Sequence, residues 1–127
     1  MNRKIKRLWV KSRMNEKIKK QWVKALTSGK YTQGINKLRY GNQNGTKHCC
    51  LGVLTDLAVK AGVCGERVAY SDKVLCDEVV EWAGLDGSNP ECGELSEYGF
   101  IHSSLSTLND KELYNFKQIA EVISRDL

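Results

Sequence analysis

Four stretches of this chain space their apolar residues three and four positions apart, as on one face of an α-helix. They cover residues 15–28, 50–61, 71–83 and 115–123, and a glycine follows each of the first three. Glycine ends helices readily because it adopts left-handed backbone angles at little steric cost. A helix with one apolar stripe has to bury that stripe against another element. The pattern therefore predicts a mainly helical domain with about four helices around one core.

Local signals mark where these helices begin and where they are packed. Asn15 and Asn115 can each cap a helix, and a glutamine three positions after Asn115 is typical of a capping box. The third helix is expected to start at Ser71 or Asp72. Gly52 lies inside the second helix, where glycine lowers stability by about 1 kcal/mol relative to alanine. We therefore expect the backbone of another element to approach the second helix closely at Gly52.

Residues 35–50 are predicted to form a small β-hairpin. Asn44 and Gly45 form the Asn-Gly pair that is a strong signal for a hairpin turn. The two strands are expected at residues 35–40 and 47–50.

The other connecting segments have the composition of loops. Residues 31–34 are predicted to be a turn-like link. Residues 84–104 contain one proline, four glycines and four acids, and are predicted to be a long irregular segment before a short helical turn at residues 104–108. The predicted fold class is therefore α+β, mainly helical, with a small hairpin.

The start of the chain repeats itself. Residues 1–11 and 14–24 are identical at eight of their eleven aligned positions, and each copy begins with Met. This period is far shorter than that of a solenoid repeat. We interpret it as a short tandem duplication, which gives a basic N-terminal arm at residues 1–13 and a single globular domain at residues 14–127.

Positive charge is concentrated near the start of the chain. Residues 1–47 hold fourteen Lys and Arg against one acid, whereas residues 48–127 hold six against fourteen Asp and Glu. Such a chain can present a basic face to nucleic acid or to an acidic protein. Alternatively, its two halves neutralise each other within the fold or across a dimer.

The arm and the first helix carry the candidate contacts to phosphates or to an acidic partner, which are Lys4, Lys6, Arg7, Lys11, Arg13, Lys17, Lys19 and Lys20. Trp9 and Trp22 are available for stacking on unpaired bases. The alternative is that the lysines cover a solvated helix face. Both tryptophans would then belong to packing, because they lie at apolar-face positions.

Several features favour a soluble protein with reduced thiols. No apolar run is long enough to span a membrane, and the basic start lacks the apolar core of a signal peptide. The five cysteines show no disulfide-framework spacing. We therefore expect free thiols, a cytoplasmic location and no membrane contact.

Four motifs follow one another from Trp22 to near the C-terminus. They are Trp22-Val23-x-Ala25-Leu26-x-Ser28-Gly29-x-Tyr31-x-Gln33-Gly34, Cys49-Cys50-Leu51-Gly52-Val53-Leu54, Leu105-x-x-Leu108-Asn109-Asp110 and Phe116-x-x-Ile119-Ala120-x-x-Ile123. With this set the chain resembles a family of small proteins found mainly in bacteriophages and prophages, and the Cys-Cys-Leu-Gly-Val-Leu motif is its most specific part. The resemblance implies a phage-infected bacterial cytoplasm as the setting, and it implies no established activity.

A cysteine nucleophile is the sharpest catalytic hypothesis. Cys49 or Cys50 would lie at the start of a helix, whose partial positive charge lowers the pKa of a thiol. His102 would act as the base, with Asn109 or Asp110 orienting it. The alternative is that Cys50 is a small apolar residue of the buried stripe.

Metal and nucleotide sites have weaker support. The candidate zinc ligands are His48, Cys49, Cys50, Cys64, Cys76, Cys92 and His102. Structural zinc sites usually contain paired ligands such as Cys-x-x-Cys, and that pairing does not occur in this sequence. No glycine-rich segment has the Gly-Lys-Ser/Thr ending of a phosphate-binding loop. We expect no metal and no cofactor.

The sequence as a whole favours a small phage accessory protein that works by binding. Its partner would be a host protein or a component of anti-phage defence. The candidate surfaces are the basic arm with the first helix, and the acids Asp77, Glu78 and Glu81 with the acidic segment that follows them. The alternatives are non-specific nucleic-acid binding through the arm and a cysteine-dependent hydrolase.

Overall fold

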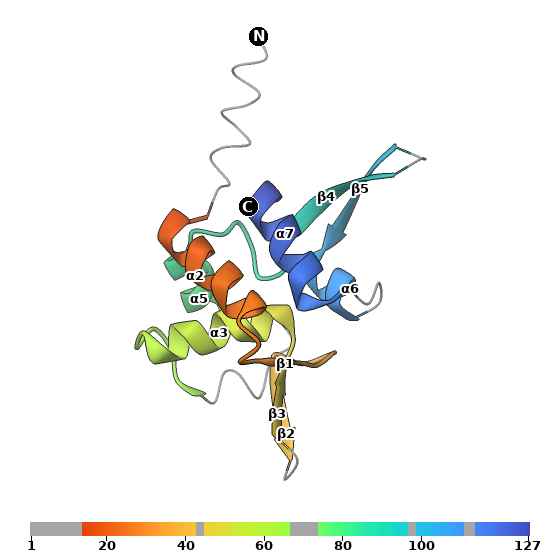
Figure 1. Ribbon diagram of the computed structural model, residues 1–127. Coiled ribbons are helices and arrows are strands. Elements are labelled where there is room, and N and C mark those ends of the chain that lie inside the picture. The colour runs from red at the N-terminus through yellow and green to blue at the C-terminus, as the bar shows by residue number, and fades with distance from the viewer. Residues whose placement is uncertain (1–13, 43–44, 67–73, 97–98, 111–113) are drawn as a thin grey trace.

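The computed structural model describes residues 14–42, 45–66, 74–96, 99–110 and 114–127 (Figure 1). The helices in these ranges are α2 (Glu16–Thr27), α3 (Cys50–Lys60), α5 (Asp77–Ala83), α6 (Leu105–Asp110) and α7 (Phe116–Asp126). The strands are β1 (Thr32–Gln33), β2 (Arg39–Asn42), β3 (Gly45–His48), β4 (Glu91–Ser96) and β5 (Gly99–Ser104). The predicted α+β, mainly helical class is confirmed. No helix in the described ranges is long and apolar enough to cross a membrane.

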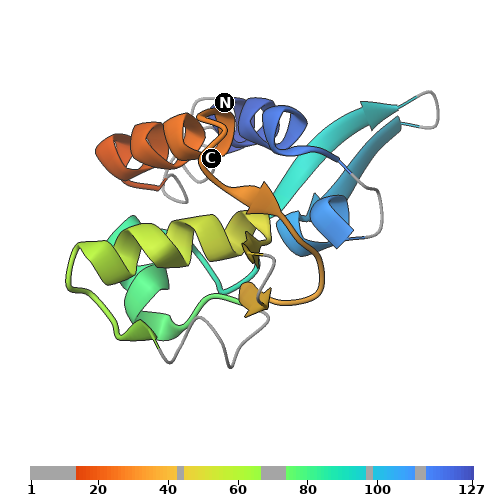
Figure 2. The same ribbon diagram turned by 60° about the horizontal axis from the view of Figure 1, so that its bottom comes forward.

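The helices form two layers. In Figure 2, α2 and α7 lie side by side in the upper layer, although they come from opposite ends of the chain. Helix α3 lies in the layer below and packs on α2, on α5 and on α6. The core therefore lies where the α2–α7 pair meets α3.

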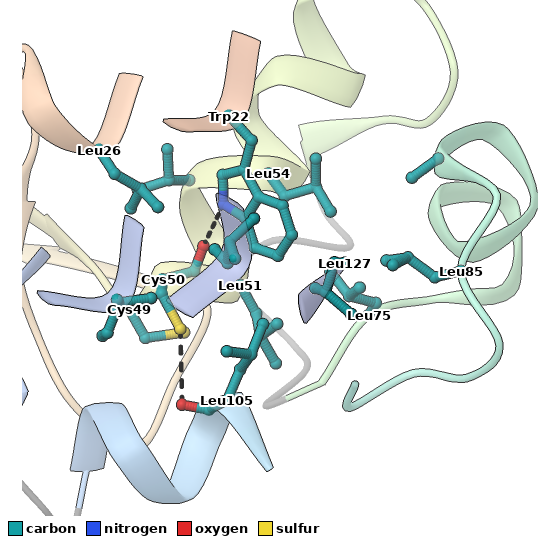
Figure 3. Packing of buried hydrophobic residues seen from close by; sticks show 14 of the residues in the cluster. Trp22, Leu26, Cys49, Cys50, Leu51, Leu54, Leu75, Leu85, Leu105 and Leu127 are labelled. Carbon is teal, nitrogen blue, oxygen red and sulfur yellow. Dashed lines mark hydrogen bonds between the residues drawn. The ribbon is translucent and has the colours of Figure 1, made fainter. Parts of the chain in front are cut away.

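Trp22 occupies the centre of this core (Figure 3). Its side chain is fully buried, and its indole Nε1 donates a hydrogen bond of 3.0 Å to the carbonyl oxygen of Cys50. The Cys50 Sγ in turn donates to the carbonyl oxygen of Leu105 at 3.6 Å. These two bonds join α2, α3 and α6 inside an otherwise apolar cluster, so the polar atoms buried there are paired.

The predicted helix boundaries are largely confirmed. The backbone N–H of Ile18 donates to Asn15 Oδ1 at 3.0 Å, and Asn115 forms a complete capping box. The glycines that follow α2, α3 and α5 have positive φ angles of 80°, 79° and 74°. The predicted start of the third helix at residue 71 or 72 is wrong. Residues 74–76 are not helical, because the backbone N–H of Leu75 donates to the Ser88 carbonyl at 2.9 Å and holds this stretch outside the helix.

The predicted hairpin exists as β2 and β3, but its strands do not have the predicted bounds of 35–40 and 47–50. The antiparallel ladder runs from Arg39 opposite His48 to Asn42 opposite Gly45. The second strand therefore ends before Cys49, which instead precedes α3. The predicted turn-like link at residues 31–34 is wrong. It contains β1, which pairs in parallel with β3 and gives the strand order β1-β3-β2.

The predicted irregular segment at residues 84–104 is wrong from Glu91 onward. It contains the antiparallel hairpin β4–β5, which projects from the body of the molecule in Figure 1. Its glycines and acids lack the apolar alternation by which a half-buried strand is recognised. The ladder satisfies the backbone groups without that pattern.

The close approach expected at Gly52 is confirmed. A Cβ atom on Gly52 would lie 1.6 Å from the carbonyl oxygen of Leu38, well inside van der Waals contact. The same carbonyl accepts a hydrogen bond of 3.2 Å from the backbone N–H of Cys49. The segment before β2 is therefore pressed against the first turn of α3, and this contact brings the polar residues of the sheet next to the helix.

Candidate functional site

The two adjacent cysteines are structural. Cys49 is 2% exposed and Cys50 is fully buried. Burial raises the pKa of the Cys49 thiol to about 11, although backbone N–H groups of the first turn of α3, from Gly52 and Leu51, act in the opposite direction. The expectation that the helix start lowers the pKa of this thiol is wrong, because desolvation outweighs the helix. A buried, protonated thiol is a poor nucleophile.

The proposed partners of these cysteines have other roles or lie apart. Asn109 is 1% exposed and was expected to orient His102. Its Oδ1 instead accepts hydrogen bonds from the Cys50 backbone N–H at 3.1 Å and from Gln33 Nε2 at 2.9 Å. Its Nδ2 donates to the Gly34 carbonyl at 2.8 Å and to the Asp110 carboxylate at 2.7 Å. Every hydrogen-bonding position of this amide is therefore used in holding the fold.

We call this set, made of Asn109 with Gln33, Gly34 and Cys50, the Asn109 network. The backbone of His102 pairs with Gly93 in the β4–β5 hairpin, and its side chain lies outside the described parts of the structure. The described part of the chain therefore contains no Cys–His–Asn arrangement for nucleophilic catalysis.

The zinc candidates do not gather either. Within the described ranges, no three His, Cys, Asp or Glu side chains are placed to hold one metal ion. The side chain of Cys92, like that of His102, lies outside those ranges.

Only some of the basic candidate residues lie in the described part of the chain, which starts at residue 14. Lys4, Lys6, Arg7, Lys11 and Arg13, together with Trp9, lie outside the described residues. Lys17 and Lys20 are exposed on α2, as expected. Lys19 and Trp22 are buried, so the expectation that Trp22 stacks on bases is wrong. Its indole ring is already enclosed by the core.

A cluster of titratable side chains surrounds Asp56 in the middle of α3. Tyr31 donates its hydroxyl to Asp56 Oδ2 at 2.5 Å, and Lys60 Nζ lies 3.1 Å from the same oxygen. The Arg39 guanidinium lies 3.7 Å from the other carboxylate oxygen. Burial opposes the charge of Asp56, but the hydrogen bonds from Tyr31 and Lys60 outweigh it and lower the pKa of this carboxyl. Asp56 is therefore an ionised anchor that accepts hydrogen bonds from Tyr31 and Lys60 and forms an ion pair with Arg39.

His48 completes this group, which we call the Asp56 cluster. Its ring meets the Tyr31 ring edge-on, with 5.0 Å between the ring centroids. His48 is only 7% exposed, and neither ring nitrogen has a hydrogen-bond partner among the described residues. Burial lowers its pKa, while the neighbouring Asp56 acts in the opposite direction. His48 is therefore held as a neutral ring, although a buried polar atom without a partner lowers stability.

The Asp56 cluster fixes Tyr31, and Tyr31 also lines a groove. Two shallow, solvent-open hollows of about 460 Å³ and 540 Å³ adjoin along the α2–α7 pair, because Thr27 and Lys117 line both. We call them together the α2–α7 groove. One hollow is lined by Val23, Thr27, Lys117, Ala120, Glu121, Ser124 and Arg125. The other is lined by Leu26, Thr27, Gly29, Tyr31, Gln33, Asn115, Phe116 and Lys117.

The chemistry of the α2–α7 groove is that of an interface. Its floor includes the buried apolar side chains of Leu26, Phe116 and Ala120. Its exposed positions carry charges of both signs, on Lys117 and Glu121. An apolar floor with a polar rim is typical of protein–protein contact surfaces.

The four motifs that follow Trp22 in the sequence build these features. The Cys-Cys-Leu-Gly-Val-Leu motif forms the start of α3, and the last motif forms α7, which borders the groove. The family described as "Domain of unknown function (DUF8296)" matches residues 14–127. The chain belongs to the DUF8296 family. The match starts at Met14, where the second copy of the repeated segment begins. No curated protein and no solved structure matches the chain.

Sequence reasoning missed both the Asp56 cluster and the α2–α7 groove of this DUF8296 domain. One local signal was present, because Asp56 and Lys60 are four positions apart on one helix and such pairs interact. The other members come from β2, β3 and the segment before β1, so only the folded chain brings them to α3. The groove depends on the pairing of α2 with α7 and has no local signal.

Proposed function

We propose that this DUF8296 protein is a small phage accessory protein that binds a host or anti-phage defence protein in its α2–α7 groove. The observation that carries the proposal is the shape and lining of this groove. It is shallow, open to solvent, apolar along its floor and charged along its rim. Such a surface fits a segment of another protein.

The shape distinguishes a protein partner from a small ligand. Sites for small molecules are usually concave and bury most of the ligand surface. Two open hollows that share Thr27 and Lys117 instead form one elongated surface. On α7 the lining residues run from Phe116 to Arg125, a stretch of about 15 Å. A helical or extended segment of a partner can lie along such a surface, with apolar side chains on the floor.

The phage setting rests on the resemblance carried by the Cys-Cys-Leu-Gly-Val-Leu motif at Cys49–Leu54. A small phage protein that acts by binding would bind a component of the infected bacterium. The proposed location is therefore the host cytoplasm. The buried thiols of Cys49 and Cys50 support a binding role over a cysteine-dependent hydrolase.

Non-specific nucleic-acid binding is the second candidate. The observation in its favour is the exposure of Lys17 and Lys20 on α2, which follow the basic residues 1–13 in the sequence. Binding of this kind weakens steeply with salt, because each phosphate contact releases a counterion. It also weakens when the chain starts at Met14, whereas docking in the groove is unaffected by that truncation.

The test is site-specific photo-crosslinking in lysate of the host bacterium, with and without nuclease. A photoreactive residue replaces Ser124 or Lys117 in the groove, or Glu81 on α5 as a control, and all three side chains are exposed. We expect one protein to crosslink from both groove positions, to survive nuclease treatment and to be missing from the control.

A matched variant tests whether the groove itself is responsible. Ser124→Arg places a bulky cation at an exposed groove position, and Glu81→Arg makes a comparable change outside the groove. We expect only Ser124→Arg to abolish the crosslink from Lys117. Equal crosslinking from all positions contradicts the proposal. Loss of every adduct on nuclease treatment, together with salt-sensitive binding that needs residues 1–13, favours nucleic acid.

A further inference from the structure

Helix α7 lines the α2–α7 groove with the residue spacing of a helix–helix contact. Along one hollow, its lining residues recur every three and four positions, at Lys117, Ala120, Glu121, Ser124 and Arg125. Residues with this spacing share one face of a helix, and helices pack against each other through such faces. The other wall of the groove is also helical, because α2 contributes Val23, Leu26 and Thr27. The groove therefore fits a third helix lying along α2 and α7.

The α2 edge of this groove is basic. Lys20 is exposed three positions before Val23, and Lys24 is exposed three positions before Thr27. Residues three positions apart are neighbours on a helix surface, so both lysines flank the lining of the groove. Lys30 is also exposed and lies in the sequence between two further lining residues. We call Lys20, Lys24 and Lys30 the lysine edge.

The positive charge of the lysine edge is not balanced nearby. None of its three lysines lies within ion-pair distance of an acid in the described part of the chain. Helix α2 as a whole has four lysines against one acid, Glu16. On the α7 wall, Arg125 pairs with Asp126 at 2.8 Å, and Glu121 is the only acid among the lining residues that the structure describes. The groove therefore keeps a net positive edge along α2.

The acids of this protein are concentrated elsewhere. Residues 74–96 hold six Asp and Glu and no Lys or Arg. Three of these acids are on α5, which packs on α3 in the lower layer of Figure 2. Two copies of the chain facing each other through the groove would bring their lysine edges together, and like charges across an interface are unfavourable. We therefore expect the complementary charge on a different protein.

We infer, on the basis of the proposed function, that the partner segment is an amphipathic α-helix with an apolar stripe and acidic residues along one edge. The apolar stripe covers the buried floor of the groove at Leu26, Phe116 and Ala120. The acidic edge lies beside α2 and faces the lysine edge. Contact with the floor supplies the buried area, and the charges select the partner and its orientation, because complementary charge mainly contributes specificity and association rate.

The test measures the binding of three fluorescent peptides by fluorescence polarisation. All three are about four helical turns long and share one apolar stripe, and their other positions carry glutamate, glutamine or lysine. We expect the glutamate peptide to bind about tenfold more tightly than the glutamine peptide, and the lysine peptide to bind most weakly. The difference should shrink at about 500 mM salt, because salt screens exposed charges. Equal affinities, or no binding of the glutamate peptide below about 1 mM, overturn the inference.

Charge reversal tests whether the lysine edge causes this preference. Lys20→Glu combined with Lys24→Glu should weaken binding of the glutamate peptide by about tenfold or more. Glutamate is a good helix former, so α2 stays folded, and the circular dichroism spectrum verifies this. The matched control reverses Lys37 and Lys47, which are exposed near β2 and on β3, and should leave the affinity unchanged. Equal losses in the two double variants overturn the inference.

Two further outcomes distinguish a nucleic-acid site and a protein partner of different chemistry. Ser124→Arg obstructs the groove but adds a cation, so it should weaken binding of the glutamate peptide without weakening nucleic-acid binding. Single-stranded DNA that displaces the peptide and binds Ser124→Arg undiminished overturns the inference in favour of nucleic acid. A host protein that crosslinks through a photoreactive residue at Ser124 equally well with and without the Lys20→Glu and Lys24→Glu changes also overturns it, while the proposed function stands.

Discussion

The three-stranded sheet is attached to the helices at two polar sites of different character. The Asn109 network contains amides and backbone groups, donates one further hydrogen bond to the Asp110 carboxylate, and uses every hydrogen-bonding position of the Asn109 side chain. The Asp56 cluster contains a carboxylate and its cationic partners, together with a histidine whose ring nitrogens have no partner among the described residues. Both sites are largely buried. What distinguishes them is how completely their buried polar atoms are hydrogen-bonded.

This difference separates two reasons for burying polar groups. A fully bonded network centred on an amide stabilises one arrangement of the chain and leaves no hydrogen-bonding group of that amide free for chemistry. A charged cluster with an unpaired histidine is less favourable for stability alone, because both desolvation and the missing bonds act against it. The Asp56 cluster also fixes Tyr31, which lines the α2–α7 groove. It therefore connects the fold to the proposed binding surface.

The largest expected effect comes from breaking the contact on which both sites depend. In Gly52→Ala the new Cβ meets the backbone of Leu38 at 1.6 Å, and neither backbone can move away cheaply. We expect a loss of about 4 kcal/mol or more in the free energy of unfolding, measured by urea denaturation. Gly65→Ala is the matched control, since a Cβ there meets nothing within 4 Å. Equal stability of the two variants would show that the Leu38 contact does not hold the sheet.

Next in size is the loss of the Asn109 network. Asn109→Leu keeps a similar volume but leaves the Cys50 N–H, the Gln33 amide and the Gly34 carbonyl without this partner. We expect the free energy of unfolding to fall by about 3 kcal/mol, because buried polar groups lose their bonds. Asn89→Ala, which removes an amide bonded to Ser106 at a half-exposed site, should lower it by about 1 kcal/mol. The two variants are compared by their midpoints of urea denaturation.

A smaller effect is expected at the Asp56 cluster. Asp56→Asn keeps the shape of the side chain but removes the charge that faces Arg39 and Lys60. We expect a loss of about 2 kcal/mol, measured by thermal and urea denaturation, because Arg39 is buried. Lys60→Met is the control and should lower stability by less than about 1 kcal/mol, since the Lys60 side chain is mostly exposed. If Asp56→Asn lowered the free energy of unfolding more than Asn109→Leu, the charged cluster would contribute more to stability than the Asn109 network, contrary to this prediction.

The smallest expected effect is a gain in stability, in contrast to the losses above, and it depends on pH. His48 has a lowered pKa in the fold, so below its ordinary pKa of 6.5 the unfolded chain binds a proton that the folded chain does not. Its contribution makes stability rise with pH through this window and fall as the pH drops below 6.5. The phenyl ring in His48→Phe keeps the contact with Tyr31 and removes both unpaired nitrogens. We expect this variant to gain up to about 1 kcal/mol at low pH and to lose the pH dependence.

Measurement of this prediction requires urea denaturation at several pH values between about 5.5 and 7.5, the range in which a histidine titrates. Asp56, Arg39 and Lys60 are the charged groups that act on His48. The pKa of Asp56 is lowered and that of Lys60 is raised, so neither group titrates in this range. His102→Phe is the control for the other histidine. The prediction is contradicted if the rise of stability with pH persists in His48→Phe and disappears in His102→Phe, because His102 would then be its source.

The sequence predicted the parts of the fold that depend on neighbours along the chain. The helix ends at Gly29, Gly62 and Gly84 follow from local backbone angles, and the close approach at Gly52 follows from the unfavourable place of glycine in a helix. The β4–β5 hairpin was missed because hydrogen bonding between backbones leaves no trace in side-chain pattern. Strand β1 was missed because two residues are too few for any periodicity.

The candidate site was less predictable than the fold. The cysteine hypothesis weighed the helix start against burial, and only the enclosed position of Cys49 shows that burial dominates. The Asp56 cluster joins side chains from several elements, and nothing in the sequence states which elements meet. The exposed lysines of α2 were predicted correctly because helical periodicity alone decides which face they occupy.

The pairing of α2 with α7 has a consequence for synthesis of the protein. The contacts of α3 with the β2–β3 hairpin form between neighbours in the sequence, so this half can take shape while the chain is still being made. Helix α2 leaves the ribosome early, but the helix that packs beside it starts only at Phe116. A nascent chain that stops before Phe116 exposes the side of α2 that α7 covers in the finished protein. Such a chain presents an apolar surface to chaperones until α7 emerges and completes the upper layer.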